Sequence, residues 1–150
     1  KKHTGKYKPH ITLVYPFQIQ DQEKLEKHIL NSIKKIKPFD IKLKGLQKSA
    51  KGHYLYLLVG KGKSKVMKLY KNLNSGILKN FKNPDMPKYI PHMTLGVFKT
   101  QKAIDKAMKD PKYKKTEISG KIDSIQLLTL KKDHSIKKIQ NFELWTKINS

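Results

Sequence analysis

Cysteine and arginine are both absent from this 150-residue chain, and acidic residues are scarce. Without cysteine, the chain forms no disulfide, offers no thiolate nucleophile and cannot build a cysteine-ligated metal centre. No apolar run approaches the roughly 20 residues of a membrane-spanning helix, and no secretory signal is visible. We therefore expect no membrane association and take the cytoplasm as the default location. The length predicts one folded domain with a substantial core.

The charge of the chain is far from balanced. All 34 basic residues are lysine, against 11 acidic residues, which gives a formal net charge of +23. Such an excess is typical of proteins that bind a polyanion such as RNA. A lysine-biased composition spread over solvated surfaces explains it equally well, and the lack of arginine favours this, because phosphate recognition usually employs arginine. The charge alone leaves both interpretations open.

One eight-residue stretch occurs twice, as KYKPHITL at residues 6–13 and as KYIPHMTL at residues 88–95. In each copy a proline favours extended backbone for the residue before it. Alternation along a strand then places the histidine and the threonine on the same face. The first copy presents His10 and Thr12, and the second presents His92 and Thr94. Two imidazoles and two hydroxyls brought together would suit the handling of a phosphoryl group.

The hydrophobic pattern predicts a mixed α+β protein. Apolar residues recur at helical spacing in three segments, residues 21–36, 64–80 and 100–109. Extended segments are predicted at residues 10–17, 39–45, 53–59, 92–98, 116–130 and 139–148, with a break at Gly120. A connecting loop is predicted at residues 79–88 and a charged turn at residues 131–138.

The order of these elements repeats with an offset of 82 residues, from His10 to His92. Each motif strand is followed by a helix and then by further strands. The repeat predicts two similar lobes, each an antiparallel-type sheet with flanking helices, related by a pseudo-twofold axis around a central cleft. The two motif strands would then occupy equivalent positions facing that cleft.

The paired motifs, His10-Ile11-Thr12-Leu13 and His92-Met93-Thr94-Leu95, resemble those of the 2H phosphoesterase superfamily. The closer resemblance is to its bacterial branch of 2′-5′ RNA ligases and 2′,3′-cyclic phosphodiesterases, and it spans residues 9–145. It implies one bilobal domain over residues 1–150. Family members carry a strand and a helix before the first motif, where this chain has nine residues. Either that part is missing here or the first lobe lacks an edge strand.

The chemistry also follows from the residue types. Displacement at phosphorus needs a base at the attacking oxygen and an acid at the leaving oxygen, and imidazole, with a pKa near ~6.5, supplies both close to neutral pH. His10 and His92 are therefore the candidate catalytic pair, and which of them is the base stays open. Thr12 and Thr94 would donate hydrogen bonds to the non-bridging phosphate oxygens.

Neither motif carries a further ligand at metal spacing, so we expect no metal and no cofactor. Tyr15, Tyr54 and Tyr56 are candidates for stacking on a nucleobase, although packing within the fold explains each of them as well. His28, His53 and His134 lie outside the motifs, and we assign them no catalytic role.

The predicted function is a metal-independent phosphoesterase that acts on 2′,3′-cyclic phosphates or 2′-5′ linked RNA or nucleotides, with reversible 2′-5′ RNA ligation implied by the resemblance. Its partners would be RNA ends or small cyclic nucleotides, and we expect a monomer. A non-catalytic basic RNA-binding module on the same fold is the alternative, although a pure binding surface has no need for paired histidines.

Overall fold

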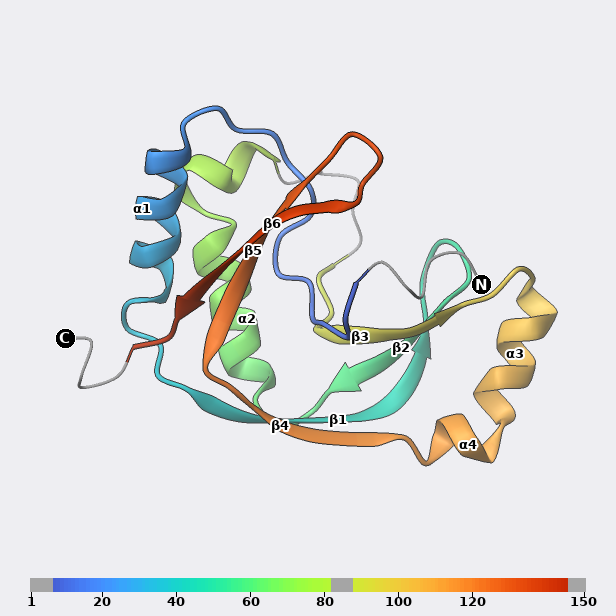
Figure 1. Cartoon of the computed structure of the whole chain (residues 1–150). Coiled ribbons are helices and arrows are strands. Elements are labelled where there is room, and N and C mark those ends of the chain that lie inside the picture. Colours follow the sequence, from blue (N-terminus) through green and yellow to red (C-terminus); the bar gives the residue numbers. More distant parts are fainter. Residues whose placement is uncertain (1–6, 82–87, 146–150) are drawn as a thin grey trace. The chain divides into compact units, whose positions relative to one another are not determined.

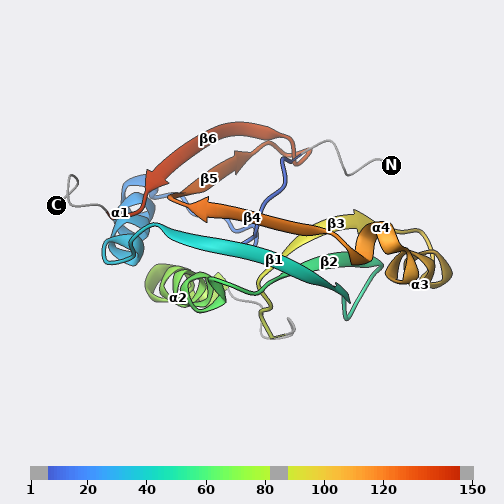
Figure 2. The same cartoon turned by 90° about the horizontal axis from the view of Figure 1, so that it is seen from below.

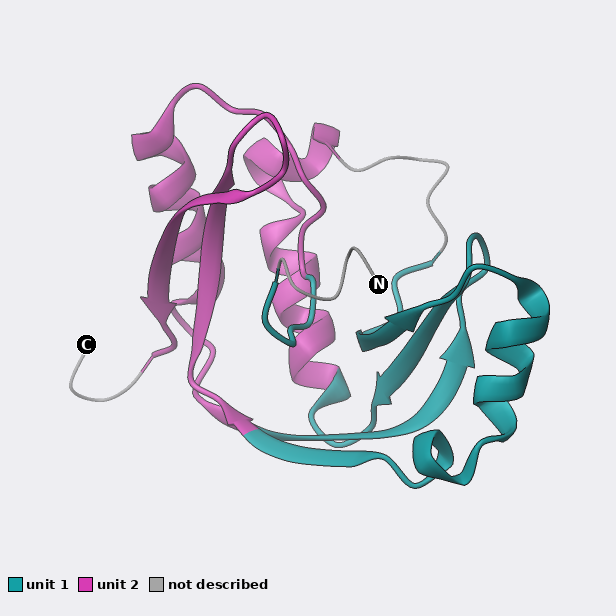
Figure 3. Ribbon diagram, turned by 45° about the vertical axis from the view of Figure 1, so that its right-hand side comes forward, with its two compact units in different colours: residues 1–12, 40–63, 87–120 teal, residues 13–39, 64–86, 121–150 magenta. Residues whose placement is uncertain are grey.

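The computed structural model describes residues 7–81 and 88–145 (Figure 1), which form two compact units. Of the described residues, unit 1 takes 7–12, 40–63 and 88–120, and unit 2 takes 13–39, 64–81 and 121–145 (Figure 3). The predicted α+β class is confirmed. The units do not follow the two halves of the chain, since each combines segments from both, and the predicted pseudo-twofold relation stays a prediction.

Unit 1 is built on a four-stranded sheet in the order β3-β2-β1-β4. Its strands are β1 (Phe39–Lys48), β2 (Tyr54–Val59), β3 (His92–Val97) and β4 (Glu117–Ile122), of which the ends of β1 and β4 reach into unit 2. β2 pairs antiparallel with both β1 and β3, and β1 and β4 run in opposite directions (Figure 2). The strands predicted over residues 39–45 and 53–59 are therefore confirmed and form a hairpin, and the predicted second motif strand is confirmed as well.

The β1–β2 pairing contains a bulge between Leu43 and Leu46. Gly45 lies inside it with a φ of 94°, a conformation that side chains of L residues rarely adopt. A glycine here lets one extra residue enter β1 while the strand continues to Lys48, three residues beyond the predicted end. The strand thereby keeps pairing along the length of β2.

Alternation along β2 separates a buried apolar face from a more exposed one. Leu55 and Leu57 are fully buried, whereas Tyr54 is 42% exposed. Leu55 packs with Ile104 and Ala107 of α3 (Gln101–Lys109), which precedes the short helix α4 (Pro111–Lys114). Burying a leucine side chain contributes about 1.5–3 kcal/mol, so this core holds β2 firmly in unit 1.

Unit 2 packs three helical segments against a two-stranded sheet. These elements are α1 (Gln22–Ile33), α2 (Lys63–Leu73, whose first residue belongs to unit 1), the 3₁₀ helix Gly76–Phe81, β5 (Ser124–Leu130) and β6 (Ile136–Glu143). The predicted apolar stripe of α1 is buried, including Leu25 and Ile29, which share a core with Leu73 and Leu78. Asp21 caps α1 by accepting a hydrogen bond from Lys24 N.

Several predicted boundaries were wrong. The first helix ends at Ile33 rather than at residue 36, and the helix predicted over 64–80 ends at Leu73. It cannot continue through Gly76, whose φ is 57°, and a 3₁₀ helix over Gly76–Phe81 replaces the end of the predicted helix and the start of the predicted loop. Residues 82–87 of that loop lie outside the described residues.

The C-terminal strands also differ from the prediction. The extended segment breaks at Asp123 rather than at Gly120, because Leu144 N donates to the Asp123 carbonyl where β5 turns away from β4. The last strand is β6, which begins three residues before the predicted start and ends before Trp145. In the part of the chain that the structure describes, no helix combines the length and apolarity needed to cross a membrane.

Candidate active site

The first motif does not form the strand predicted over residues 10–17. Only Ile11 pairs, through a single antiparallel bridge to Met93 in β3. The chain leaves the sheet directly afterwards: the Leu13 carbonyl accepts a 3.0 Å hydrogen bond from the Asn74 side chain, and Leu13 packs against the core of unit 2. A strand needs a continuous partner, and the packing of Leu13 and Val14 against the core of unit 2 takes the segment away from β3.

The Ile11–Met93 bridge nevertheless brings the two motifs together within unit 1. Because the pairing is antiparallel, it places His10 across from Thr94 and Thr12 across from His92. Alternation of successive residues predicts that all four side chains lie on the face opposite to Ile11 and Met93. A 2.8 Å hydrogen bond from the Tyr89 hydroxyl to the Thr12 carbonyl holds the first motif in place.

Each imidazole contacts the backbone carbonyl oxygen of the residue two positions before it in the chain. Nδ1 of His10 lies 2.7 Å from the Lys8 carbonyl oxygen, and Nδ1 of His92 lies 2.6 Å from the Ile90 carbonyl oxygen. A carbonyl oxygen only accepts, so Nδ1 carries the proton in both rings. In the neutral imidazole this leaves the lone pair on Nε2, which can accept a proton and, once protonated, donate it.

The surroundings of the two histidines differ. His10 is exposed, and its ring meets the edge of Tyr7 at a centroid distance of 5.9 Å. His92 is partly buried, and Tyr56 of β2 stacks on it at 3.6 Å with an interplanar angle of 25°. Burial lowers the pKa of His92, the Ile90 carbonyl opposes this shift, and the charge of His10 adds to the lowering.

Comparison with known protein families identifies the family to which the chain belongs. A model of the 2′-5′ RNA ligase superfamily matches residues 1–134, which include both motifs. The chain belongs to this superfamily of 2H phosphoesterases. The resemblance inferred from the paired motifs is thus confirmed at the level of the superfamily, and the bacterial branch stays a prediction. No curated protein matches the chain.

The remaining predicted residues of this 2H phosphoesterase lie in different places. Tyr54 and Tyr56 belong to unit 1, and Tyr56 lies opposite Thr94 in the β2–β3 pairing. Tyr15 belongs to unit 2, where it is 45% exposed and where burial, followed by the charge of Tyr70, raises its pKa. Stacking of Tyr15 or Tyr56 on a nucleobase stays a prediction. Sequence reasoning named Tyr56 but missed its contact with His92, because that contact depends on strand register.

The other described histidines lie outside both motifs. Nε2 of His28 lies 2.8 Å from the Leu73 carbonyl oxygen and so ties α1 to the end of α2. The His53 carbonyl accepts a hydrogen bond from Phe98 N next to the β2–β3 ladder. His134 occupies the turn between β5 and β6 with a φ of 64°. The contacts named for His28 and His53 involve neither motif.

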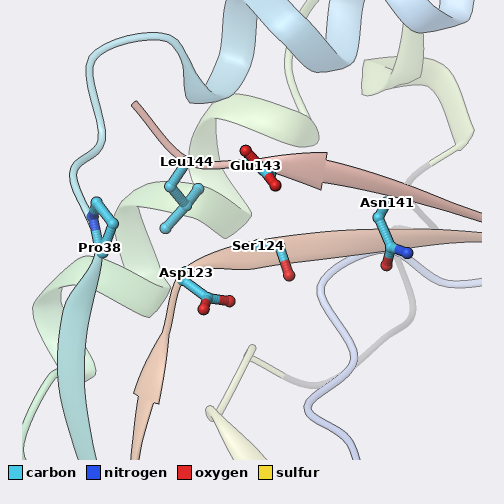
Figure 4. A pocket seen from close by; sticks show the side chains of 6 residues that line it. All are labelled: Pro38, Asp123, Ser124, Asn141, Glu143 and Leu144. Atoms are coloured by element: carbon cyan, nitrogen blue, oxygen red, sulfur yellow. The ribbon is translucent and has the colours of Figure 1, made fainter. Parts of the chain in front are cut away.

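A surface hollow of about 450 Å³ lies in unit 2, and its lining includes no residue of either motif (Figure 4). It is lined by Pro38 and by residues at the ends of β5 and β6, namely Asp123, Ser124, Asn141, Glu143 and Leu144. Two carboxylates in this lining would repel an anionic phosphate. We therefore do not place the candidate active site there.

Metal ligands are not gathered in the described parts of the molecule. Among residues 7–81 and 88–145, no three His, Cys, Asp or Glu side chains are grouped so that they could hold a metal ion. That catalysis needs no metal stays a prediction.

Proposed function

We propose that this 2H phosphoesterase cleaves 2′,3′-cyclic phosphates or related 2′-linked phosphodiesters, with His10 and His92 as a paired acid and base and without a metal. The Ile11–Met93 bridge is the observation that carries the proposal, because it joins two His-x-Thr segments in one unit. The equal tethering of both Nδ1 atoms supports it, since each Nε2 is then available for proton transfer.

Hydrolysis of a cyclic phosphate requires two proton transfers. The oxygen of water forms a bond to phosphorus while one ribose P–O bond breaks. Nε2 of the neutral histidine accepts the proton that the water loses, and Nε2–H of the protonated histidine donates a proton to the departing ribose oxygen. The two histidines end with exchanged protonation states, and proton exchange with solvent restores them.

Thr12 and Thr94 would stabilise the charge that develops during the displacement. Each lies across from the histidine of the other motif, so the two kinds of group alternate around the site. Their hydroxyl groups would donate hydrogen bonds to the non-bridging oxygens of phosphorus, where negative charge gathers in the transition state. This role differs from proton transfer, since the threonines keep their protons throughout.

Ligation would use the same groups with another nucleophile. If the 5′-hydroxyl of a second RNA replaces water, its oxygen bonds to phosphorus and the 3′-oxygen departs, which leaves a 2′-5′ linkage. We place hydrolysis first and ligation as its variant. A monomer of the bacterial branch, working in the cytoplasm on RNA ends or small cyclic nucleotides, remains our expectation from the sequence.

The charge of the chain supports a second candidate. With a formal net charge of +23, the protein would attract RNA even without turnover, as a non-catalytic binding module. The retention of histidine and threonine in both motifs favours the enzyme, because binding alone does not require paired proton-transfer groups.

Turnover of a 2′,3′-cyclic mononucleotide and of a cyclic-phosphate-ended RNA, measured side by side, tests the proposal. Wild type should convert at least one of them to a phosphomonoester, and His10→Ala should not. His53→Ala is the matched control, because His53 lies in the same unit but outside the motifs. RNA binding by wild type without turnover of either substrate would instead favour the binding module.

A further inference from the structure

The contact between Tyr56 and His92 makes the two motifs unequal. Tyr56 pairs with Thr94, so His92 is its diagonal neighbour across β2 and β3. Diagonal neighbours are about 7–8 Å apart along the backbone, within reach of an aromatic side chain. The ring of Tyr56 closes this distance and lies nearly parallel to the imidazole, with centroids 3.6 Å apart.

Tyr56 is itself held by a rigid part of unit 1. It lies on an inner strand, with Gln47 of β1 on one side and Thr94 of β3 on the other. Both of its chain neighbours, Leu55 and Leu57, are fully buried. Because the backbone on either side is anchored in the core, the ring is a firm surface for the imidazole to rest on.

The two histidines differ in the ring that accompanies the carbonyl contact. The Ile90 carbonyl fixes one edge of the His92 ring, and the stacked ring of Tyr56 fixes its orientation. His10 has the equivalent carbonyl contact, but its ring is exposed, and Tyr7 meets it in a T-shaped arrangement rather than by stacking. The direction in which Nε2 points is thus better defined for His92.

We propose that Tyr56 is a positioning residue, which orients the His92 imidazole by stacking on it and shields one ring face from water, so that His92 is the proton acceptor in hydrolysis and His10 the donor. This inference rests on the proposed function for its catalytic part. The stacking and its effect on the imidazole are properties of the protein alone.

Titratable groups from two elements face His92. Tyr56 approaches from β2, and His10 approaches from the first motif segment, where its charge acts on His92. Burial is the largest cause that lowers the pKa of His92, and Tyr56 contributes to this burial by covering a ring face. Removing the ring at position 56 should therefore raise the pKa of His92 toward its ordinary value.

Three variants test the proposal. Tyr56→Leu removes the stacked ring, and Tyr56→Phe keeps it. Tyr54→Leu removes a tyrosine two residues away on the same strand and serves as the matched control. If Tyr56→Leu does not fold, as judged by circular dichroism, Tyr56→Met takes its place, because its longer and more flexible side chain adapts better to the space that the ring leaves.

The first measurement is an NMR titration of the His92 ring in the protein without substrate, with its signal assigned by comparison with His92→Ala. We expect the pKa of His92 to rise in Tyr56→Leu and to stay at the wild-type value in Tyr56→Phe and Tyr54→Leu. An unchanged pKa in Tyr56→Leu would overturn the proposal, and so would an equal rise in Tyr54→Leu. The NMR titration tests the effect of Tyr56 on the His92 imidazole even if the protein turns over no substrate.

The second measurement is steady-state kinetics with the cyclic substrate that wild type hydrolyses. Tyr56→Leu should lower kcat by about 10- to 100-fold with little change in KM, because a displaced proton acceptor affects the transition state. The acidic limb of its pH–rate profile should move to higher pH. A rise in KM with unchanged kcat and an unchanged acidic limb would instead show that Tyr56 contacts the nucleobase, which contradicts the positioning role.

Discussion

Ile11 lies opposite Met93 in an antiparallel bridge, and this pair of apolar residues joins the two His-x-Thr motifs. The bridge and the hydrogen bond from Tyr89 to the Thr12 carbonyl connect segments that are 82 positions apart in the chain. Alternation then predicts that the histidines and threonines share the opposite face. The backbone pairing thus arranges the candidate active site, even though the paired residues themselves take no part in the chemistry.

Replacing either histidine should impair the chemical step. His10→Ala and His92→Ala should each lower kcat by about 10²–10⁴-fold, the usual contribution of a positioned acid or base. In the double variant the losses should not multiply, because groups that act in one transition state are not additive. Single-turnover rates of the two single variants and the double variant check this, and a fully multiplicative loss would contradict it.

Activity should survive a chelator. The described residues contain no group of three metal-ligating side chains, and both proposed proton-transfer groups are imidazoles. Turnover after extensive dialysis against EDTA should equal that of the untreated enzyme. Loss of activity that zinc or magnesium restores would show that a metal takes part.

The stability of the protein should depend on pH through His92. Because burial lowers its pKa in the folded state, the pKa rises to about 6.5 on unfolding. The stability that neutral His92 contributes is therefore complete above about pH 6.5 and is lost as the pH falls through the folded pKa. Urea unfolding from pH 7.5 to 5 should show a smaller decline for His92→Gln than for wild type. Parallel curves for the two proteins would contradict this.

The core beneath β2 should be sensitive to truncation. Leu55 is fully buried against Ile104 and Ala107, so Leu55→Ala should lower the free energy of unfolding by about 2–5 kcal/mol. Val97 is 43% exposed in the neighbouring strand, and Val97→Ala should change it far less. Urea denaturation measures both, and an equal effect of the two changes would place Leu55 outside the core.

If the excess of lysine promotes RNA binding, salt should weaken RNA binding without slowing the chemical step. The affinity for RNA ends should fall with salt, with a slope of log K against log[salt] of about 0.7 per neutralised phosphate. The proposed chemistry depends on short-range groups, so kcat should stay nearly constant while KM for RNA rises. A cyclic mononucleotide should respond little. If KM for RNA and KM for the cyclic mononucleotide responded equally to salt, the lysine excess would have no specific role in RNA binding.

Local patterns in the sequence determined much of this protein. The burial of Leu55 and Leu57, the cap at Asp21 and the strand at His92 all follow from periodicity or from residues close together in the chain. Such features depend on neighbours within a few positions, so they can be predicted from the sequence alone. The paired motifs likewise identified the superfamily, because their residue types and spacing are visible without a structure.

Only the tertiary structure decided how the motifs meet. The first motif has the same alternation as the second, yet it pairs at Ile11 alone, because from Leu13 onward the apolar side chains of the segment pack against the core of unit 2. The stacking of Tyr56 on His92 likewise depends on the register between β2 and β3, which includes an irregularity after Leu55. Strand partners and register are set by contacts between distant segments, and a local pattern carries no information about them.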